Sequence, residues 1–258
     1  MPRKIHNTAI IEPGAQLADD VEVGAQAYIG KYVKIGSGSI VMHHATVDGD
    51  TSIGHANVIH PYAYLGGLTQ DLKYAGEHTG LLIGNHNVFR EFFTVHTATK
   101  PNESTIIGDD NTFLAYAHVA HDCVIGNGII MSSHAALGGH VIIGDHANIG
   151  WSAGIHQFCR VGNYAMVSAM AKATMDVPPY MIADGMPARI RSFNRINLER
   201  HGFSEQDVRI VKEIYLALYA QTKVRAETLM ELRKASTIPG DLYDNVCSFF
   251  ESSDRGVC

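Results

Sequence analysis

The chain is poor in charge and in aromatic side chains. Charged residues make up 18% of its 258 residues and aromatic residues 8%, with a single tryptophan. Acidic residues outnumber basic ones by 26 to 20. The basic excess typical of a nucleic-acid-binding protein is therefore missing, and we expect no nucleic-acid partner. Hydrophobic residues reach 46%, which excludes an intrinsically disordered chain.

Long apolar runs and cysteines are also scarce. No run approaches the roughly 18 apolar residues of a membrane span, so we expect none. Residues 1–14 contain Arg3, Lys4 and Glu12, and no signal peptide is visible among them. Four cysteines are too few for a disulfide framework. These absences predict a soluble cytoplasmic protein, and the length allows one or two domains.

A six-residue repeat dominates the part of the chain that is rich in glycine and histidine. Stepping by six from Ile11 to Val167 meets Ile, Leu, Val, Met or Phe at every position except Asp71, Glu77 and Pro101. A second column, two residues earlier, is mostly small. Glycine often follows the large residue, where it suits a tight corner. A period of six with one large and one small inward residue is typical of a parallel β-helix in which three hexads close each coil.

The breaks in this frame define the rest of the fold. We expect loops at 66–82 and 96–106 that leave the coil. Proline and glycine at 176–180 and 185–187 end the repeat, and the chain reads as helical from about Asn194. Ser204 and Asp207 have the spacing of a helix N-cap. The sequence therefore predicts a mainly β architecture, with a β-helix over 1–190 and a helical domain over 191–258.

Residues three hexads apart should stack in neighbouring coils. This places His121 under Gly139 and Gly139 under Gln157, with Asp122 under His140. His118 precedes His121 by one turn of chain, and His156 adjoins Gln157. Imidazoles, a carboxylate and a glycine backbone on one edge could supply a general base, a group that orients it and oxyanion donors.

Other chemistry has weaker support. The spacing of His55 and His60 could suit a zinc site, but no stacked histidine completes it, so we predict no metal site. Cys123 and Cys159 fall in the small inward column and are expected to pack there without thiol chemistry. Most remaining histidines are expected on the surface.

Several motifs together resemble one family, the UDP-N-acetylglucosamine acyltransferases of lipid A biosynthesis. They are residues 70–77 (QDLKYAGE), 117–123 (AHVAHDC), 139–141 (GHV), 156–159 (HQFC), 176–180 (DVPPY) and 255–256 (RG). The resemblance covers nearly the whole chain. It implies a left-handed parallel β-helix and a homotrimer with active sites between subunits. It also implies transfer of an (R)-3-hydroxyacyl group from the phosphopantetheine of acyl carrier protein to the 3-hydroxyl of UDP-N-acetylglucosamine, without any further cofactor.

The resemblance also implies roles for individual residues. His121 matches the general base, Asp122 the carboxylate that orients it, and the Gly139 N–H the oxyanion donor. The residues that match sugar, phosphate and nucleotide contacts, or lie beside them, are Gln70, Asp71, Lys73, His118, His140, His156, Gln157, Asn194 and Arg200. Three departures leave the uridine and phosphate contacts open: His96-Thr97-Ala98-Thr99, Ile196 where the family often has an acidic residue, and His201 within Arg200-His201-Gly202.

Acyl length and docking are assigned on the same basis. The residues matching the acyl-chain ruler are Met166, Ala169 and Met170, although the two methionines could simply pack the coil. Carrier protein is acidic, so Lys172, Arg189, Arg191 and Arg195 are expected to form its docking patch; the alternative is a solvated basic face. Two functional alternatives stay open: a related N-acyltransferase acting on an amino-sugar nucleotide, and a non-catalytic scaffold. Because the hexads begin by Ile11, we expect this chain to lack the N-terminal uridine-binding domain of the known N-acyltransferases.

Overall fold

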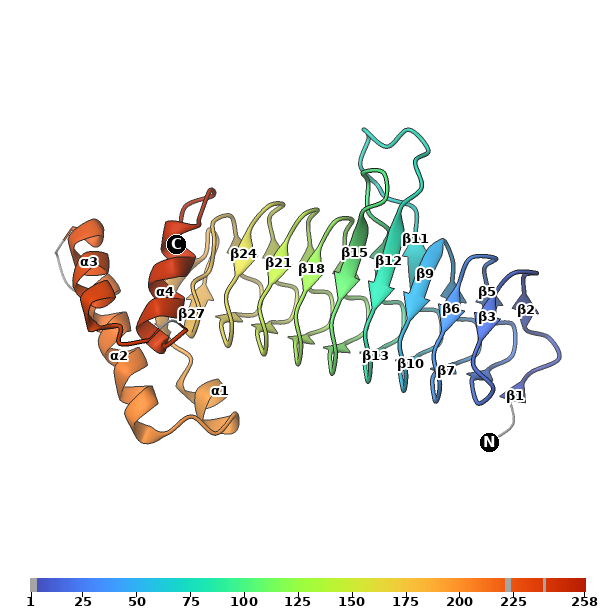
Figure 1. Cartoon of the computed structure of the whole chain (residues 1–258), viewed down its shortest axis with the longest axis horizontal. Helices are drawn as coiled ribbons and strands as arrows, with labels where there is room; N and C mark the ends of the chain where they lie inside the picture. Colours follow the sequence, from blue (N-terminus) through green and yellow to red (C-terminus); the bar gives the residue numbers. More distant parts are fainter. Residues whose placement is uncertain (1–3, 221–223, 239) are drawn as a thin grey trace.

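The computed structural model describes residues 4–220, 224–238 and 240–258. The chain winds into a three-sided prism of very short strands that ends in a group of helices (Figure 1). Each side of the prism is a sheet in which a strand pairs with the third strand along the chain, except at the end of the first sheet, where β25 pairs with β27 and β27 with β28. The predicted fold class, a parallel β-helix with a helical tail, is confirmed. Residues 1–3 of the predicted β-helix lie outside the described residues.

The three sheets have these strands. The first sheet contains β1 (Lys4–Ile5), β4 (Glu22–Val23), β7 (Ile40–Val41), β10 (Val58–Ile59), β13 (Val88–Phe89), β16 (Thr112–Phe113), β19 (Ile130–Met131), β22 (Asn148–Ile149), β25 (Met166–Val167), β27 (Met181–Asp184) and β28 (Arg189–Phe193). The second contains β2 (Ile10–Ile11), β5 (Tyr28–Ile29), β8 (Thr46–Val47), β11 (Tyr64–Gly67), β14 (Thr94–His96), β17 (His118–Val119), β20 (Ala136–Leu137), β23 (Gly154–Ile155) and β26 (Lys172–Ala173). The third contains β3 (Gln16–Leu17), β6 (Lys34–Ile35), β9 (Asp50–Ile53), β12 (Gly80–Ile83), β15 (Ser104–Ile107), β18 (Val124–Ile125), β21 (Ile142–Ile143) and β24 (Arg160–Val161).

The repeat frame points into the prism. Val23, Ile29 and Ile35 occupy the three walls of one coil and are at most 3% exposed. The small column fills the space beside the corners, and Cys123 and Cys159 are buried there as free thiols, as predicted. Large and small inward residues thus alternate along each wall and pack between successive coils.

Asparagines replace the small column at one corner, between the third and first sheets. Asn87 donates from its backbone N and from Nδ2 to Oδ1 of Asn57, at 3.0 Å each. Asn111 donates its backbone N–H to Oδ1 of Asn87 at 3.0 Å, and Ile129 donates to Oδ1 of Asn111 at 2.8 Å. These amides are buried, and their hydrogen bonds to each other and to the backbone offset the cost of burying them.

Two loops leave the prism at the corner between the second and third sheets. An ordinary coil advances by three hexads, as from Gln16 to its partner Lys34. The coil from Asp50 to its partner Gly80 is longer by two hexads, and the coil from Gly80 to Ser104 is longer by one. The loops run over 68–79 and 97–103, so both are shorter than the predicted loops at 66–82 and 96–106. The difference arises because β11, β12 and β15 lengthen to four residues at the base of the loops (Figure 1).

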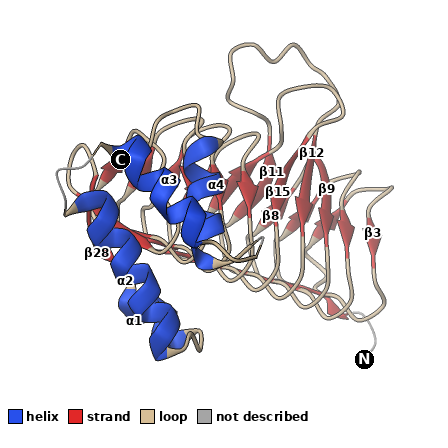
Figure 2. Ribbon diagram, turned by 60° about the vertical axis from the view of Figure 1, so that its left-hand side comes forward, coloured by secondary structure: helices blue, strands red, loops and turns tan. Residues whose placement is uncertain are grey.

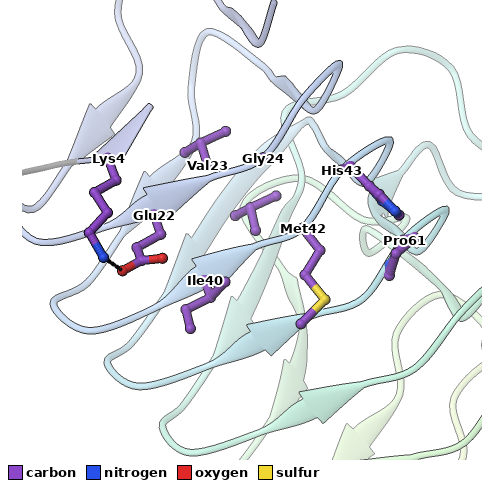
Figure 3. A pocket seen from close by; sticks show the side chains of 9 residues that line it. Lys4, Glu22, Val23, Gly24, Ile40, Met42, His43 and Pro61 are labelled. Carbon is purple, nitrogen blue, oxygen red and sulfur yellow. Dashed lines mark hydrogen bonds and ion pairs between the residues drawn. The ribbon is translucent and has the colours of Figure 1, made fainter. Parts of the chain in front are cut away.

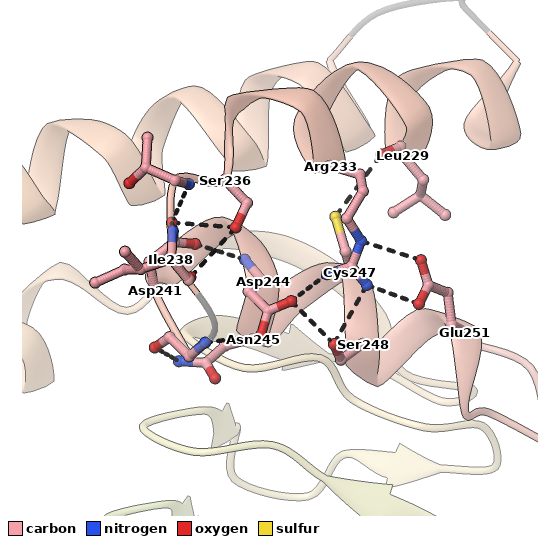
Figure 4. Close-up of polar contacts among 12 residues, drawn as sticks. Leu229, Arg233, Ser236, Ile238, Asp241, Asp244, Asn245, Cys247, Ser248 and Glu251 are labelled. Carbon is pink, nitrogen blue, oxygen red and sulfur yellow. Dashed lines mark hydrogen bonds and ion pairs between the residues drawn. The ribbon is translucent and has the colours of Figure 1, made fainter.

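The tail covers the last coils. After the antiparallel pair β27–β28 come α1 (Arg195–Arg200), α2 (Glu205–Tyr219), α3 (Arg225–Ala235) and α4 (Leu242–Glu251). The Ser204 and Asp207 signal is a full capping box at the start of α2. The helices pack together at the end of the prism far from the N-terminus (Figure 2). Arg233 of α3 binds Glu251 at 2.7 Å and also Asp244, both on α4 (Figure 4). The predicted domain boundary at 190–191 falls inside β28 and stays a prediction.

Candidate active site

The candidate site lies on the corner between the second and third sheets, called here the site edge. It consists of residues 120–123, 138–141 and 156–159, each group following a strand of the second sheet. His140 donates its backbone N–H to the carbonyl of His121 at 3.1 Å, and Phe158 donates to Gly139 at 3.0 Å. The three corners therefore stack as the three-hexad period predicts.

His121 and Asp122 form a close pair on this edge. Nδ1 of His121 lies 2.6 Å from Oδ2 of Asp122, with the two side chains 13% and 5% exposed. Thr99 donates its N–H to Oδ1 of Asp122 at 3.0 Å, and its hydroxyl lies 3.1 Å from Nδ1 of His121. Burial raises the pKa of Asp122, but hydrogen bonds from Thr99 and His121 outweigh it and the pKa is lowered. An ionised Asp122 places the proton of a neutral His121 on Nδ1, so Nε2 keeps its lone pair.

Two further imidazoles flank this pair. Nε2 of His140 lies 3.6 Å from Oδ2 of Asp122, and its ring is perpendicular to that of His121, with centroids 5.4 Å apart. His118 is held by Thr94, whose Oγ1 lies 2.8 Å from Nδ1 of His118. Burial, and then the neighbouring His121, lowers the pKa of His118, which favours its neutral form.

A groove of about 620 Å³ runs from this cluster along the outer face of the second sheet. Its residues are Gln70, His118, Ala120, His121, Ala136, Leu137, Gly138, Gly139, Ser152, Gly154, Ile155, His156, Ala171, Lys172 and Met186. Ala136 and Gly154 stack in register between His118 and Lys172. Because these two middle positions carry small side chains, they form the floor of an open channel parallel to the prism axis.

Gly139 brings its backbone close to the imidazole of His121. A Cβ atom at this position would lie 2.7 Å from Nε2 and 3.1 Å from Nδ1 of His121. The ring can therefore rest against the corner only if residue 139 is glycine. Within the described part of the chain, the Gly139 N–H has no hydrogen-bond acceptor.

The loop over 68–79, which we call the first insert, adds residues from outside the coil. Asp71 brings a carboxylate oxygen within 4.8 Å of ring nitrogens of His121 and His140. Gln70 lines the groove, and exposed Lys73 donates its backbone N–H to Oδ1 of Asp71 at 2.9 Å. The C-terminal segment also returns to the site edge, where Nη2 of Arg255 lies 3.1 Å from Nδ1 of His156. Gln157 is exposed beside it.

The other predicted residues lie away from this cluster. Asn194 is buried, and its Nδ2 donates to the carbonyl of Tyr164 at 2.8 Å, at the corner between the third and first sheets. Arg200 is exposed at the end of α1. A single chain therefore does not bring these two tail residues to His121.

The residues assigned to acyl length and docking are spread along the end of the prism. Met166 lies on the first sheet and pairs with Ile182, outside the groove. Met170 is 57% exposed and donates its N–H to Trp151, next to the groove residue Ser152, while Ala169 precedes it on the same corner. The four basic residues assigned to docking are all exposed, but they lie on different elements: Lys172 lines the groove, Arg189 and Arg191 are on β28, and Arg195 is on α1. Arg195 is paired with Glu199 at 2.6 Å.

Sequence reasoning missed the residues that support the pair. Thr99 lies in the loop over 97–103, which we call the second insert. The hexad frame is interrupted there, so no periodicity pointed to Thr99. Thr105 accepts the backbone N–H of Asp122 at 2.8 Å, and Met186 reaches the groove from the turn between β27 and β28. Ala136 and Gly154 are small residues at outward-facing positions of the second sheet. The sequence signal that could have identified them is the lack of large side chains at these two positions.

A second hollow, near the N-terminus, offers no comparable set of groups. It lies against the first sheet between Lys4, Glu22, Ile40, Met42 and Pro61 (Figure 3). Its charged groups are already paired, Lys4 to Glu22 at 2.7 Å. In the described ranges, no helix is both long and apolar enough to cross a bilayer.

Comparison with known proteins decides the family. The chain is 40% identical over 257 residues to acyl-[acyl-carrier-protein]–UDP-N-acetylglucosamine O-acyltransferase of Thermodesulfovibrio yellowstonii, covering 99% of each chain. It is 43% identical over 258 residues to the enzyme of the same name from Paraburkholderia xenovorans, covering 98% of each. The chain belongs to the UDP-N-acetylglucosamine O-acyltransferase family. It is an acyltransferase of lipid A biosynthesis.

Structural comparison agrees with this membership. The solved UDP-N-acetylglucosamine acyltransferase from Campylobacter jejuni superposes with a TM-score of 0.92 at 35% identity, covering 98% of each chain. A family model described as domain 2 of UDP-N-acetylglucosamine O-acyltransferase matches residues 176–258 of this acyltransferase. The resemblance drawn from the motifs is therefore confirmed at the level of family and fold.

Proposed function

We propose that this acyltransferase moves an (R)-3-hydroxyacyl group from acyl carrier protein to the 3-hydroxyl of UDP-N-acetylglucosamine, with His121 as general base. The observation that carries the proposal is the pair of His121 and Asp122, 2.6 Å apart at the head of an open groove. Asp122 holds Nδ1, so the other ring nitrogen is free to accept a proton. Family membership supports the same donor and acceptor.

We infer the following steps for the reaction. Nε2 of His121 takes the proton of the sugar hydroxyl while that oxygen attacks the thioester carbonyl. The carbonyl oxygen becomes negative in the tetrahedral intermediate, and the free N–H of Gly139 is the donor for it. The intermediate collapses to the ester. The phosphopantetheine sulfur leaves and receives the proton from the imidazolium, so the base is regenerated without a cofactor.

The surroundings of the pair suit the two substrates. The side chains assigned to the sugar nucleotide are Gln70, Asp71, Lys73, His118, His140, His156 and Gln157. They are mostly polar donors and acceptors that could fix a sugar and a diphosphate. The channel over Ala136 and Gly154 accepts the acyl chain, where each buried CH₂ contributes about 0.8 kcal/mol. Met166, Ala169 and Met170 stay the candidates that limit its length, with Met170 nearest the channel.

The site is proposed to be completed by a second subunit of a homotrimer. Asn194 and Arg200 lie far from His121 in their own chain, so any nucleotide contact from them is made in a neighbour's site. The surface also suits assembly, because apolar side chains are exposed in successive coils of the third sheet. These are Leu82, Ile106, Val124 and Ile142, and Leu72 is fully exposed on the first insert.

Carrier protein is proposed to dock where the groove ends. Lys172 and Arg189 are exposed there, and Ala188 donates its N–H to the Lys172 carbonyl at 2.8 Å, which joins the two segments. A cationic rim suits an acidic carrier and the phosphate of its prosthetic group. We place the reaction in the cytoplasm, which agrees with four free, buried cysteines.

The test is product formation with 3-hydroxyacyl carrier proteins of several chain lengths and UDP-N-acetylglucosamine, read by mass. The native chain should yield an ester. His121→Ala should lower turnover at least about 10²-fold with an unchanged melting temperature. His134→Ala is the matched control, because His134 is exposed on another corner and stacks on Tyr116. Near-normal turnover by His121→Ala would reject the mechanism, and product only from a 3-amino sugar nucleotide would reject the acceptor.

A further inference from the structure

Three potential metal ligands converge at the site edge from separate parts of the chain. Asp71 comes from the first insert, His121 from one corner and His140 from the corner above it. One ligand atom of each lies within 4.8 Å of the other two. Each of the three side chains is only partly buried, so an ion can reach all three from solvent.

The free lone pair on Nε2 of His121 suits metal binding as well as proton transfer. Its Nδ1 is held by the Asp122 carboxylate at 2.6 Å, which leaves the lone pair on Nε2 facing away from Asp122. A carboxylate behind a ligating imidazole is the usual arrangement in metal sites, because it fixes the tautomer and raises the basicity of the ligand.

The ligand types favour zinc over magnesium and calcium. Two imidazoles and one carboxylate are typical of Zn²⁺, whereas Mg²⁺ and Ca²⁺ prefer oxygen ligands only. With bonds of about 2.0–2.1 Å, tetrahedral ligand atoms lie about 3.3 Å apart. The ligand atoms therefore need to approach by up to about 1.5 Å, which a movement of the loop carrying Asp71 would provide. Asp71 and Asp122 together balance the double charge of the ion.

We propose that Zn²⁺ binds to Asp71, His121 and His140 and inhibits the acyltransferase in competition with the sugar nucleotide. The ion occupies the lone pair that must accept the hydroxyl proton and displaces the sugar from Asp71 and His140. Water fills the fourth position, on the groove side. The inhibitory consequence rests on the proposed function, whereas the binding itself does not.

The experiment measures binding without any substrate. Untagged protein competes with a chromophoric zinc indicator, and Co²⁺ serves as a spectroscopic probe through its visible absorption. We expect one ion per chain. Asp71→Asn and His140→Gln should each weaken Zn²⁺ binding at least about tenfold and change the Co²⁺ spectrum. Both side chains lie outside the packed interior, so both variants should fold, which their melting temperatures check.

Two controls separate this site from other histidines. His134→Gln removes an exposed imidazole from another corner and should leave binding unchanged. His86→Gln tests the pair of His55 and His86, whose rings lie 5.0 Å apart. UDP-N-acetylglucosamine should raise the apparent Kd for zinc. Unchanged affinity in both Asp71→Asn and His140→Gln, or its loss in His86→Gln, would overturn the proposal. Zinc bound at the site by a protein that forms no ester would instead reject only the proposed function.

Discussion

Gly139→Ala is the substitution whose effect can be worked out most directly from the structure. The new methyl carbon would lie 2.7 Å from Nε2 of His121, where an unstrained contact needs about 3.5 Å. The imidazole can swing away, so the fold survives, but the base moves by about 1 Å from its place beside Asp122. A misplacement of this size can cost about 10²-fold in rate, or about 2.7 kcal/mol of activation free energy.

The assay is kcat at saturating 3-hydroxyacyl carrier protein and UDP-N-acetylglucosamine, together with the melting temperature. Gly154→Ala is the matched control. It adds the same methyl group to the groove, and apart from its chain neighbours no described residue has a heavy atom within 4 Å of its Cβ position. We expect the control to keep kcat within a few-fold and both variants to melt as the native protein does. The reasoning is refuted if Gly139→Ala keeps near-native kcat, or if its crystal structure shows His121 unmoved.

Three further outcomes are expected. Burial, followed by the imidazoles nearby, lowers the pKa of His96 to about 4. Between about pH 6.5 and 4 the unfolded chain binds a proton at this residue more readily than the folded chain does, so the free energy of unfolding falls as the pH falls through this interval. The melting temperature of His96→Gln should therefore depend less on pH over this interval than that of the native chain; equal slopes would contradict this. Replacing Lys172 and Arg189 together by alanine should raise KM for acyl carrier protein about tenfold at low salt and flatten its salt dependence, measured by initial rates. Gly154→Val should shift the product towards shorter acyl chains and Met170→Gly towards longer ones, read by mass; an unchanged distribution in both would remove these residues from the acyl site.

The strands of the prism could be predicted because every coil has the same pattern of inward residues. Each hexad supplies one large inward residue, so a hexad that departs from the pattern can still be assigned from the hexads before and after it. The same period placed His121, Asp122 and Gly139 together without knowledge of the fold. What the period could not supply was anything outside it: Thr99 lies in an insert, and its contacts with the pair depend on how that loop folds back.

The tail shows a different limit. Asn194 belongs to a family motif, yet in its own chain its amide is buried against Tyr164. A motif shows that Asn194 is shared with the family, but not which subunit of the proposed homotrimer it would serve. That information requires the arrangement of chains, which a single sequence contains only indirectly.

The two inserts lengthen their coils by two hexads and by one, so both are whole multiples of the repeat. Such an insert lengthens a corner without changing which wall every later residue occupies. A single added residue would instead shift the hexad register of all following residues by one. The large side chains would then face solvent until a further insertion or deletion restored the register. The loops at this edge, which we propose contact the substrates, can thus be exchanged in whole hexads while the corner that carries His121 stays in phase. The prism therefore allows the recognition loops to vary in length independently of the chemistry, which offers a practical rule for grafting loops between related enzymes.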